Sequence, residues 1–151
     1  MLFYSRREEM PSIRIRACLA VVFSNEILLV PHYYNDGRPV QWHLPGDGVN
    51  YLETLEQAAI REFYEETGLH ARADKQYFVS EVIEPETPWH SIAISFLGII
   101  TGGILKAEGH HFSAKWGDKT PRWFSEAQLN EVRYHPPAAI KAAFVEVRKL
   151  R

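Results

Sequence analysis

REFYEETGL, residues 61–69, decides the fold, because it places Glu62, Glu65 and Glu66 at spacings of three and four just before a glycine. In a helix these carboxylates share one side and repel one another, near the end where the helix dipole disfavours negative charge. A solvated helix face usually alternates charges, whereas here Arg61 is the one nearby cation. A divalent cation would relieve the repulsion, and hard oxygen ligands suit magnesium or manganese.

The helix that carries these glutamates has recognisable ends. Thr54 followed by Gln57 is a capping-box signal, and Gly68 is a typical helix stop, so we expect a helix from 54 to 67. Ala59, Ile60, Phe63 and Tyr64 form an apolar sector on the helical wheel, and the glutamate sector begins at its edge. The carboxylates are therefore expected to line the rim of a cleft.

Five further segments have the apolar patterns of strands: 13–23, 27–34, 72–84, 90–101 and 122–124. The turn residues 24–26 predict that the first two strands form a hairpin, and EPETP predicts a turn between the third and fourth. A polar loop is expected at 106–121. Ile140, Phe144 and Val147 predict an amphipathic helix in the tail after Pro136. Strands with two helices indicate an α/β or α+β sandwich.

Composition restricts the class of protein. A chain of 151 residues suits one domain, 1–151, and a formal charge of -2 gives no global argument for nucleic acid or an anionic membrane. The single cysteine, Cys18, rules out a disulfide framework within the chain and is expected to be buried and inert. No apolar run approaches the roughly 20 residues that span a bilayer. We expect a cytoplasmic protein.

GDGVNYLETLEQAAIREFYEETGL, residues 46–69, resembles the Nudix box, with the pattern G-x5-E-x7-R-E-U-x-E-E-x-G-U, where U is a large apolar residue. The resemblance implies an α/β/α sandwich with a mixed central sheet and a hydrolase that cleaves a pyrophosphate bond. Eight positions match in register: Glu53, Arg61, Glu62, Phe63, Glu65, Glu66, Gly68 and Leu69.

The resemblance also implies roles for individual residues. It implies that Mg²⁺ or Mn²⁺ is bound by Glu62, Glu65, Glu66 and the carbonyl of Gly46. Either Glu65 or Glu66 would handle the proton of the attacking water. Glu53 is a further ligand or a partner of Arg61, whose guanidinium can hold a carboxylate in a bidentate grip.

Two positions depart from the family pattern. Asp47 stands where the pattern has its first glycine, and Leu52 replaces a glycine that commonly precedes Glu53. If position 47 requires a left-handed backbone, aspartate tolerates it at a cost that glycine avoids. The Asp47 carboxylate would either bind metal or repel phosphate, and the sequence leaves both alternatives open.

Substrate-binding residues are harder to assign. Arg38, His43 and Trp116 are the candidates, with Arg14 and Arg16 as further phosphate contacts. Pro85 lies sixteen residues after Leu69, a position the resemblance associates with ADP-ribose hydrolases, although a proline-rich turn explains it equally well. In the loop, His110 and His111 are weak candidates for a metal site, and Glu108 and Asp118 are candidates for a mobile catalytic base. All four are more simply explained as solvated loop residues.

The sequence therefore favours a metal-dependent hydrolase of a nucleoside diphosphate linked to another group, with ADP-ribose or a nucleotide sugar slightly ahead. One alternative is a nucleoside triphosphate pyrophosphohydrolase, including one for oxidised nucleotides. Others are a non-catalytic nucleotide-binding regulatory domain and, less favoured, an isomerase of isoprenoid diphosphates. The expected partner is a small nucleotide, with no membrane and no nucleic-acid polymer, and a homodimer is left open.

Overall fold

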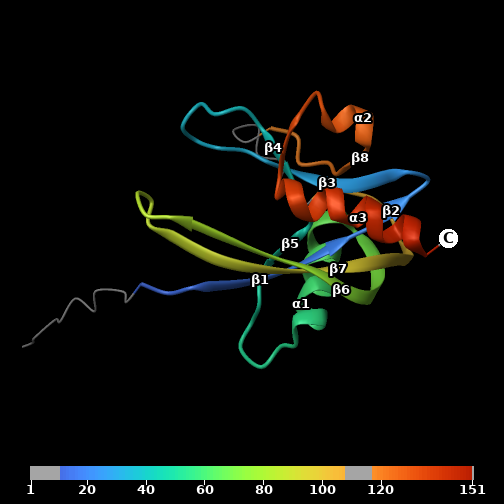
Figure 1. Ribbon diagram of the computed structural model, residues 1–151, viewed down its shortest axis with the longest axis horizontal. Coiled ribbons are helices and arrows are strands. Elements are labelled where there is room, and N and C mark those ends of the chain that lie inside the picture. The colour runs from blue at the N-terminus through green and yellow to red at the C-terminus, as the bar shows by residue number, and fades with distance from the viewer. Residues whose placement is uncertain (1–10, 108–116, 151) are drawn as a thin grey trace, which may run out of the picture.

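The computed structural model describes residues 11–107 and 117–150 as two packed sheets with helices around them (Figure 1). The first sheet has the strand order β5-β1-β7-β6, and the second has β2-β3-β4-β9 with β8 paired to β3. Both sheets are mixed, because β1 pairs with β7 and β4 with β9 in parallel, while the other pairs are antiparallel. The strands are β1 (Arg14–Ala20), β2 (Val22–Phe23), β3 (Glu26–His32), β4 (Gln41–His43), β5 (Gly46–Gly48), β6 (Leu69–Glu84), β7 (Trp89–Gly103), β8 (Arg122–Ser125) and β9 (Arg133–His135).

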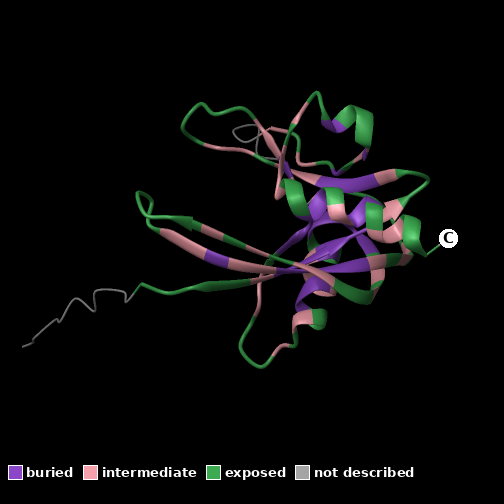
Figure 2. Ribbon diagram, in the orientation of Figure 1, coloured by how far each residue is buried: buried purple, intermediate pink, exposed green. Residues whose placement is uncertain are grey.

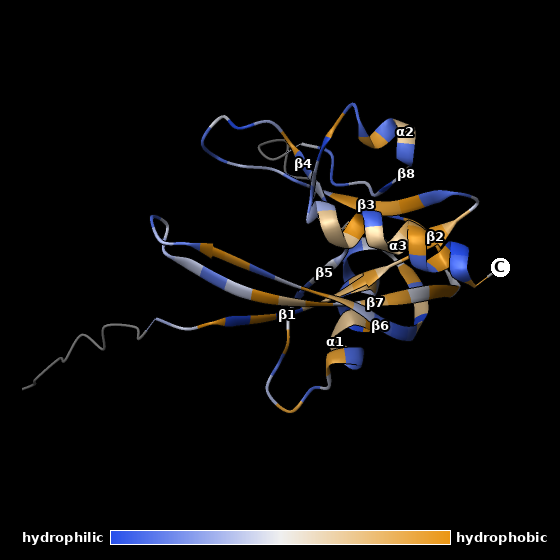
Figure 3. Ribbon diagram, viewed as in Figure 1, coloured by the Kyte–Doolittle hydropathy of each residue, from blue (hydrophilic) through white to orange (hydrophobic). Residues whose placement is uncertain are grey.

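Two apolar clusters lie on opposite faces of the first sheet. On one face α1 (Leu55–Thr67) buries Ala58, Ala59 and Phe63 against β1 and β7. On the other face α3 (Pro137–Lys149) and the second sheet close a larger cluster that contains Ile140 and Phe144. Figure 2 shows that the buried segments lie where the two sheets pack against α3. Figure 3 shows hydrophobic residues along the strands in the same region. The expected sandwich is confirmed, with a short extra helix, α2 (Glu126–Leu129).

The ends of α1 agree with the sequence. The Thr54 hydroxyl accepts from the Gln57 backbone N–H, and the Gln57 side chain accepts from the Thr54 N–H, which completes the capping box. Gly68 ends the helix in a left-handed conformation with φ 75°, and a Cβ there would collide with the Ile104 carbonyl. Tyr64 differs from expectation, because it is exposed and stacks on His70 instead of facing the core.

The predicted first hairpin is partly wrong. The turn exists, with Ser24 and Asn25 at φ 50° and 60°, but it joins β2 to β3. The strand expected at 13–23 divides at Val21, so that β1 lies in the first sheet and β2 in the second. The division was invisible in the sequence because residues on both sides of Val21 are apolar and most of them are buried.

Two arms extend from the packed centre on the same side of the molecule (Figure 1). One is the hairpin of β6 and β7, whose turn lies at 85–88 as the EPETP segment predicted. The other is the chain between β3 and β4. Among the described residues, no helix is long and apolar enough to cross a membrane.

Candidate active site

Arg61 is the centre of the charge network on α1. Its guanidinium grips Glu53 with two hydrogen bonds of 2.7 and 2.9 Å, and it donates to Glu62 at 2.6 Å. It also contacts Glu65 at 3.3 Å and the Gly48 carbonyl at 3.1 Å. The bidentate bond from Arg61 lowers the pKa of Glu53 to about 2. Of the two roles left open for Glu53, a metal ligand or a partner of Arg61, the structure shows the pairing with Arg61.

The other helix carboxylates are partly withdrawn from water. The Glu62 side chain is 12% exposed, and its pKa is raised because desolvation outweighs the attraction of Arg61. Glu66 is buried, and its Oε2 accepts from the Gly46 backbone N–H at 3.3 Å. Glu65 is half-exposed, with 49% of its side chain open to solvent. Burial of like charges on one helix face is unfavourable unless a cation compensates for it.

These oxygen donors have the chemistry that magnesium or manganese prefers. In the part of the chain that the structure describes, no group of three or more His, Cys, Asp or Glu side chains is already gathered to hold an ion. The Gly46 carbonyl, a ligand implied by the resemblance, accepts from Arg16 Nη2 at 3.2 Å. A cation bound through this carbonyl would lie close to the Arg16 guanidinium, because Nη2 is 3.2 Å from the same oxygen.

The two departures from the family pattern have different structural consequences. Asp47 is not among the described residues with positive φ, so position 47 needs no left-handed backbone. Leu52 is the strained position, with φ 67° and 87% of its surface exposed. The Asp47 carboxylate accepts from the Gly48 N–H at 2.8 Å and lies 3.6 Å from Arg16 Nε.

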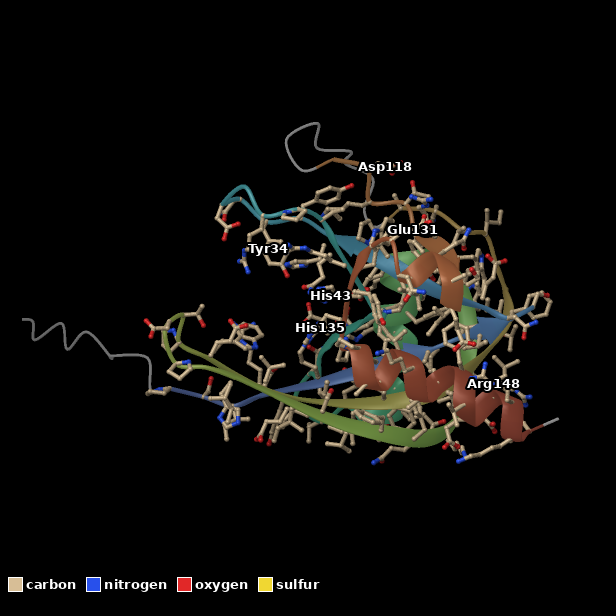
Figure 4. The ribbon with its side chains drawn as sticks, turned by 45° about the horizontal axis from the view of Figure 1, so that its top comes forward. Tyr34, His43, Asp118, Glu131, His135 and Arg148 are labelled. Carbon is tan, nitrogen blue, oxygen red and sulfur yellow. The ribbon has the colours of Figure 1, made fainter. Side chains whose placement is uncertain are left out.

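A cavity of about 770 Å³ opens between the two sheets, beside the C-terminal end of α1. Glu66 and Gly46 lie in the wall of this cavity, so the cavity is next to the acidic face of α1. Figure 4 shows Tyr34, His43 and His135 between the two arms. The cavity lining also contains four basic side chains, two from β1, one from the segment between β3 and β4, and one from the segment before β8: Arg14, Arg16, Arg38 and Lys119.

Three histidines from adjacent strands lie side by side in this cavity. His43 stacks on His32 with ring centroids 4.9 Å apart, and its centroid is 5.5 Å from that of His135. Burial lowers the pKa of all three, that of His43 to about 3, and the charge of Arg16 lowers them further. The three rings are therefore neutral at physiological pH.

Two arginine–aromatic pairs line the cavity, one from the first sheet and the other from the segment between β3 and β4. The Arg14 guanidinium lies 4.5 Å from the Trp89 ring centroid, and the Arg38 guanidinium lies 3.9 Å from that of Tyr34. Each pair combines a flat apolar surface with a positive charge. A ligand that carries a base and phosphates meets both requirements here.

The structure brings together some of the expected residues and leaves others apart. Arg38, His43, Arg14 and Arg16 share the cavity with Glu66 and Gly46. Cys18 is buried, as expected, and desolvation raises its pKa to about 12. Four candidates lie outside the described residues: Trp116, His110, His111 and Glu108. Asp118 is described, and its carboxylate accepts from Thr120.

Sequence reasoning missed part of the cavity wall: Tyr34, Gln41, His32 and His135. One signal was available for Gln41, because it alternates with the buried Trp42 and therefore faces the same side as His43. His32 and His135 become neighbours of His43 only through strand pairing, which the sequence pattern does not specify.

The comparisons with known proteins agree with this architecture. The model of the NUDIX domain matches residues 13–148, and the chain belongs to the Nudix family. A NUDIX hydrolase from Nitrosomonas europaea superposes with a TM-score of 0.71 at 16% identity, over 92% of this chain and 90% of that one. An ADP-ribose pyrophosphatase from Streptococcus suis has a TM-score of 0.66 at 18% identity, over 91% and 93%. At such identities the likeness concerns the fold.

Curated relatives are proteins named RNA pyrophosphohydrolase. That of Brucella ovis is 26% identical over 120 residues, which are 78% of this chain and 58% of the relative. That of Brucella anthropi is 28% identical over 78% of this chain and 59% of the relative. The chain thus spans less than two thirds of the length of these relatives.

Proposed function

We propose that this protein hydrolyses a pyrophosphate bond in a nucleoside diphosphate linked to another group, with Mg²⁺ or Mn²⁺ as cofactor. ADP-ribose and nucleotide sugars are the substrate classes that we favour over nucleoside triphosphates. The observation that carries the proposal is the contact of Glu66 with Gly46 in the wall of a cavity lined with basic and aromatic side chains. A cytoplasmic setting remains part of the proposal.

The chain supplies the positioning that such a reaction requires. Glu62, Glu65 and Glu66 would hold the ion, which neutralises phosphate oxygens and activates a water when bound. Arg61 fixes the first two of these carboxylates from one side. Glu65, the most exposed of the three, is in the better position to take up a proton from water and release it to solvent. Arg14 and Arg38 would provide positive charge for the phosphates. Their aromatic partners, Trp89 and Tyr34, would provide flat surfaces for the base.

A second candidate is a pyrophosphohydrolase that acts on RNA. The names of the Brucella relatives favour it. The cavity is lined by residues of both arms, and an RNA strand bound by its 5′ end would extend out of the cavity between them. A formal charge of -2 provides no global attraction for a polyanion, so a polymer was not expected from the sequence. The two candidates share the same reaction centre and differ in what lies beyond the first nucleotide.

A substrate panel tests the proposal. Products are separated after incubation with ADP-ribose, nucleotide sugars, nucleoside triphosphates and a 5′-triphosphorylated RNA oligonucleotide, each with Mg²⁺, Mn²⁺ or EDTA. The proposal expects metal-dependent release of a nucleoside monophosphate from a nucleoside diphosphate linked to a second group. Exclusive cleavage of the RNA would favour the second candidate. Absence of cleavage by the folded protein with either metal would overturn the proposal in favour of a binding domain.

A further inference from the structure

Gln41 presents a fixed amide inside the cavity. It lies on β4 in the cavity wall. Its Oε1 accepts one hydrogen bond from the Tyr34 hydroxyl at 2.6 Å and faces His43 Nε2 at 3.0 Å. Because an amide oxygen can only accept, His43 carries its proton on Nε2 and donates it to Gln41. The two lone pairs of the Gln41 oxygen are thereby occupied.

Both donors to Gln41 are themselves held in place. The Tyr34 ring meets the edge of His32 at a centroid distance of 4.8 Å and has the Arg38 guanidinium over it. His43 lies between His32 and His135 in the row of rings. Burial keeps the His43 imidazole neutral, since its pKa falls to about 3. The Gln41 amide can therefore rotate only if two hydrogen bonds break.

The amide nitrogen of Gln41 remains for a ligand. Within residues 11–107 and 117–150 it makes no hydrogen bond. A glutamine that recognises adenine uses both ends of its amide, accepting from N6 and donating to N7. That mode is closed here because the oxygen is already occupied. A keto oxygen, such as O6 of guanine or O4 of uracil, needs only a donor, whereas the amino group at the same ring position of adenine cannot accept from the Gln41 amide.

We propose that Gln41 selects nucleotides with a keto-bearing base over adenine nucleotides. This inference rests on the proposed function, because it assigns the base of the same substrate. It favours GDP- or UDP-linked compounds over ADP-ribose. Tyr34 and His43 act as positioning residues for the amide, and Arg38 holds Tyr34 in turn.

The test compares two ligands that differ at the six-membered ring edge. Binding of inosine diphosphate and adenosine diphosphate is measured by calorimetry in EDTA, so that the readout is independent of turnover. Wild type is expected to bind inosine diphosphate about tenfold more tightly, because adenine sets an amino group against the Gln41 amide. Turnover of GDP-glucose and ADP-glucose with Mg²⁺ should follow the same order.

The decisive variant is Gln41→Glu. One carboxylate oxygen can still accept from Tyr34 and His43, while the other becomes an acceptor that faces the ligand. The preference should then reverse towards adenosine diphosphate, although the added charge weakens both affinities. Gln76→Glu is the matched control, because Gln76 is exposed on β6 outside the cavity lining, and its ratio of affinities should equal that of wild type.

Tyr34→Phe provides a second variant if Gln41→Glu does not fold. Loss of one donor frees a lone pair on Gln41, so the preference for inosine diphosphate should shrink several-fold. Equal wild-type affinities, or a ratio unchanged in the variants, would overturn the inference even where metal-dependent hydrolysis is observed. A preference that reverses in Gln41→Glu without any hydrolysis would uphold the base selection and overturn the proposed activity.

Discussion

Leu52 occupies a backbone conformation that suits glycine. Its φ of 67° strains an L-residue, while its side chain is 87% exposed and gives little packing in return. Leu52→Gly should therefore raise the free energy of unfolding by about 1 kcal/mol, which is roughly 2–4 °C in melting temperature for a chain of this size. Thermal unfolding followed by circular dichroism measures the change.

Tyr51→Gly is the matched control for that prediction. Tyr51 is 92% exposed and is not among the described residues with positive φ. Glycine there only adds freedom to the unfolded chain, so the melting temperature should fall or stay unchanged. Equal shifts in the two variants would show that backbone conformation at Leu52 is not the cause.

Asp47 adds a negative charge to the cavity wall, and it is not among the described residues with positive φ. Asp47→Asn keeps an acceptor for the Gly48 N–H and removes the charge near Arg16. Arg16 Nε has no hydrogen-bond partner among the described residues, so its charge should then attract phosphate more strongly. We expect the KM to fall about two- to fivefold at low salt, and by less at high salt. An increase in KM would make Asp47 a participant in binding.

Residue roles were predictable where they depend on local spacing. The two hydrogen bonds from Arg61 to Glu53 join residues eight positions apart in one motif, and this pairing was one of the two roles predicted for Glu53. The place of the Gln41 amide depends on Tyr34, which reaches it from the other end of a loop, and on His43, whose ring packs against histidines of β3 and β9. Such contacts follow from strand register, which depends on packing of the whole sheet.

Secondary-structure elements were predictable where their ends carry chemical signals. The limits of α1 followed from Thr54, Gln57 and Gly68, and α3 followed from the apolar spacing of its core face. The short strands β4, β5 and β9 escaped notice because three residues give no periodicity. The division between β1 and β2 escaped for a related reason, since a continuous apolar run has no internal boundary.

The row of histidines on β3, β4 and β9 makes stability depend on pH. Their pKa values lie below the ordinary 6.5, so below that pH the unfolded chain binds protons that the folded chain resists. The free energy of unfolding should therefore fall as pH drops from 6.5, and for His43 this continues to about pH 3. His43→Gln should reduce the slope by about 1 kcal/mol per pH unit between pH 6 and 5.

Urea unfolding of wild type and His43→Gln at a series of pH values measures that slope. Because the substitution also changes packing, the two proteins can differ in their free energy of unfolding at pH 8. The comparison therefore uses the slope of the free energy of unfolding with pH, and not its absolute value. Parallel curves for the two proteins would contradict the assignment of His43 as a buried neutral imidazole.

At the scale of the whole molecule, the site lies between the two sheets. No single sequence motif predicted that these two sheets would face each other. Glu66 comes from α1, Trp89 from one arm and Tyr34 from the other. That residues 1–151 form one domain stays a prediction. If the chain is one domain, urea should unfold it in a single transition, with the same midpoint by tryptophan fluorescence and by circular dichroism.

The most direct measurement of the central claim compares Glu66→Gln with Glu56→Gln in Mn²⁺ binding and turnover. Both residues lie on α1, but Glu66 is buried at the cavity while Glu56 is exposed in the first turn. Glu66→Gln should weaken Mn²⁺ binding and reduce kcat at least about a hundredfold, with a melting temperature in EDTA that is unchanged or higher, whereas Glu56→Gln should retain both properties. Undiminished turnover and Mn²⁺ binding in folded Glu66→Gln would contradict a metal-dependent reaction centred on the acidic helix.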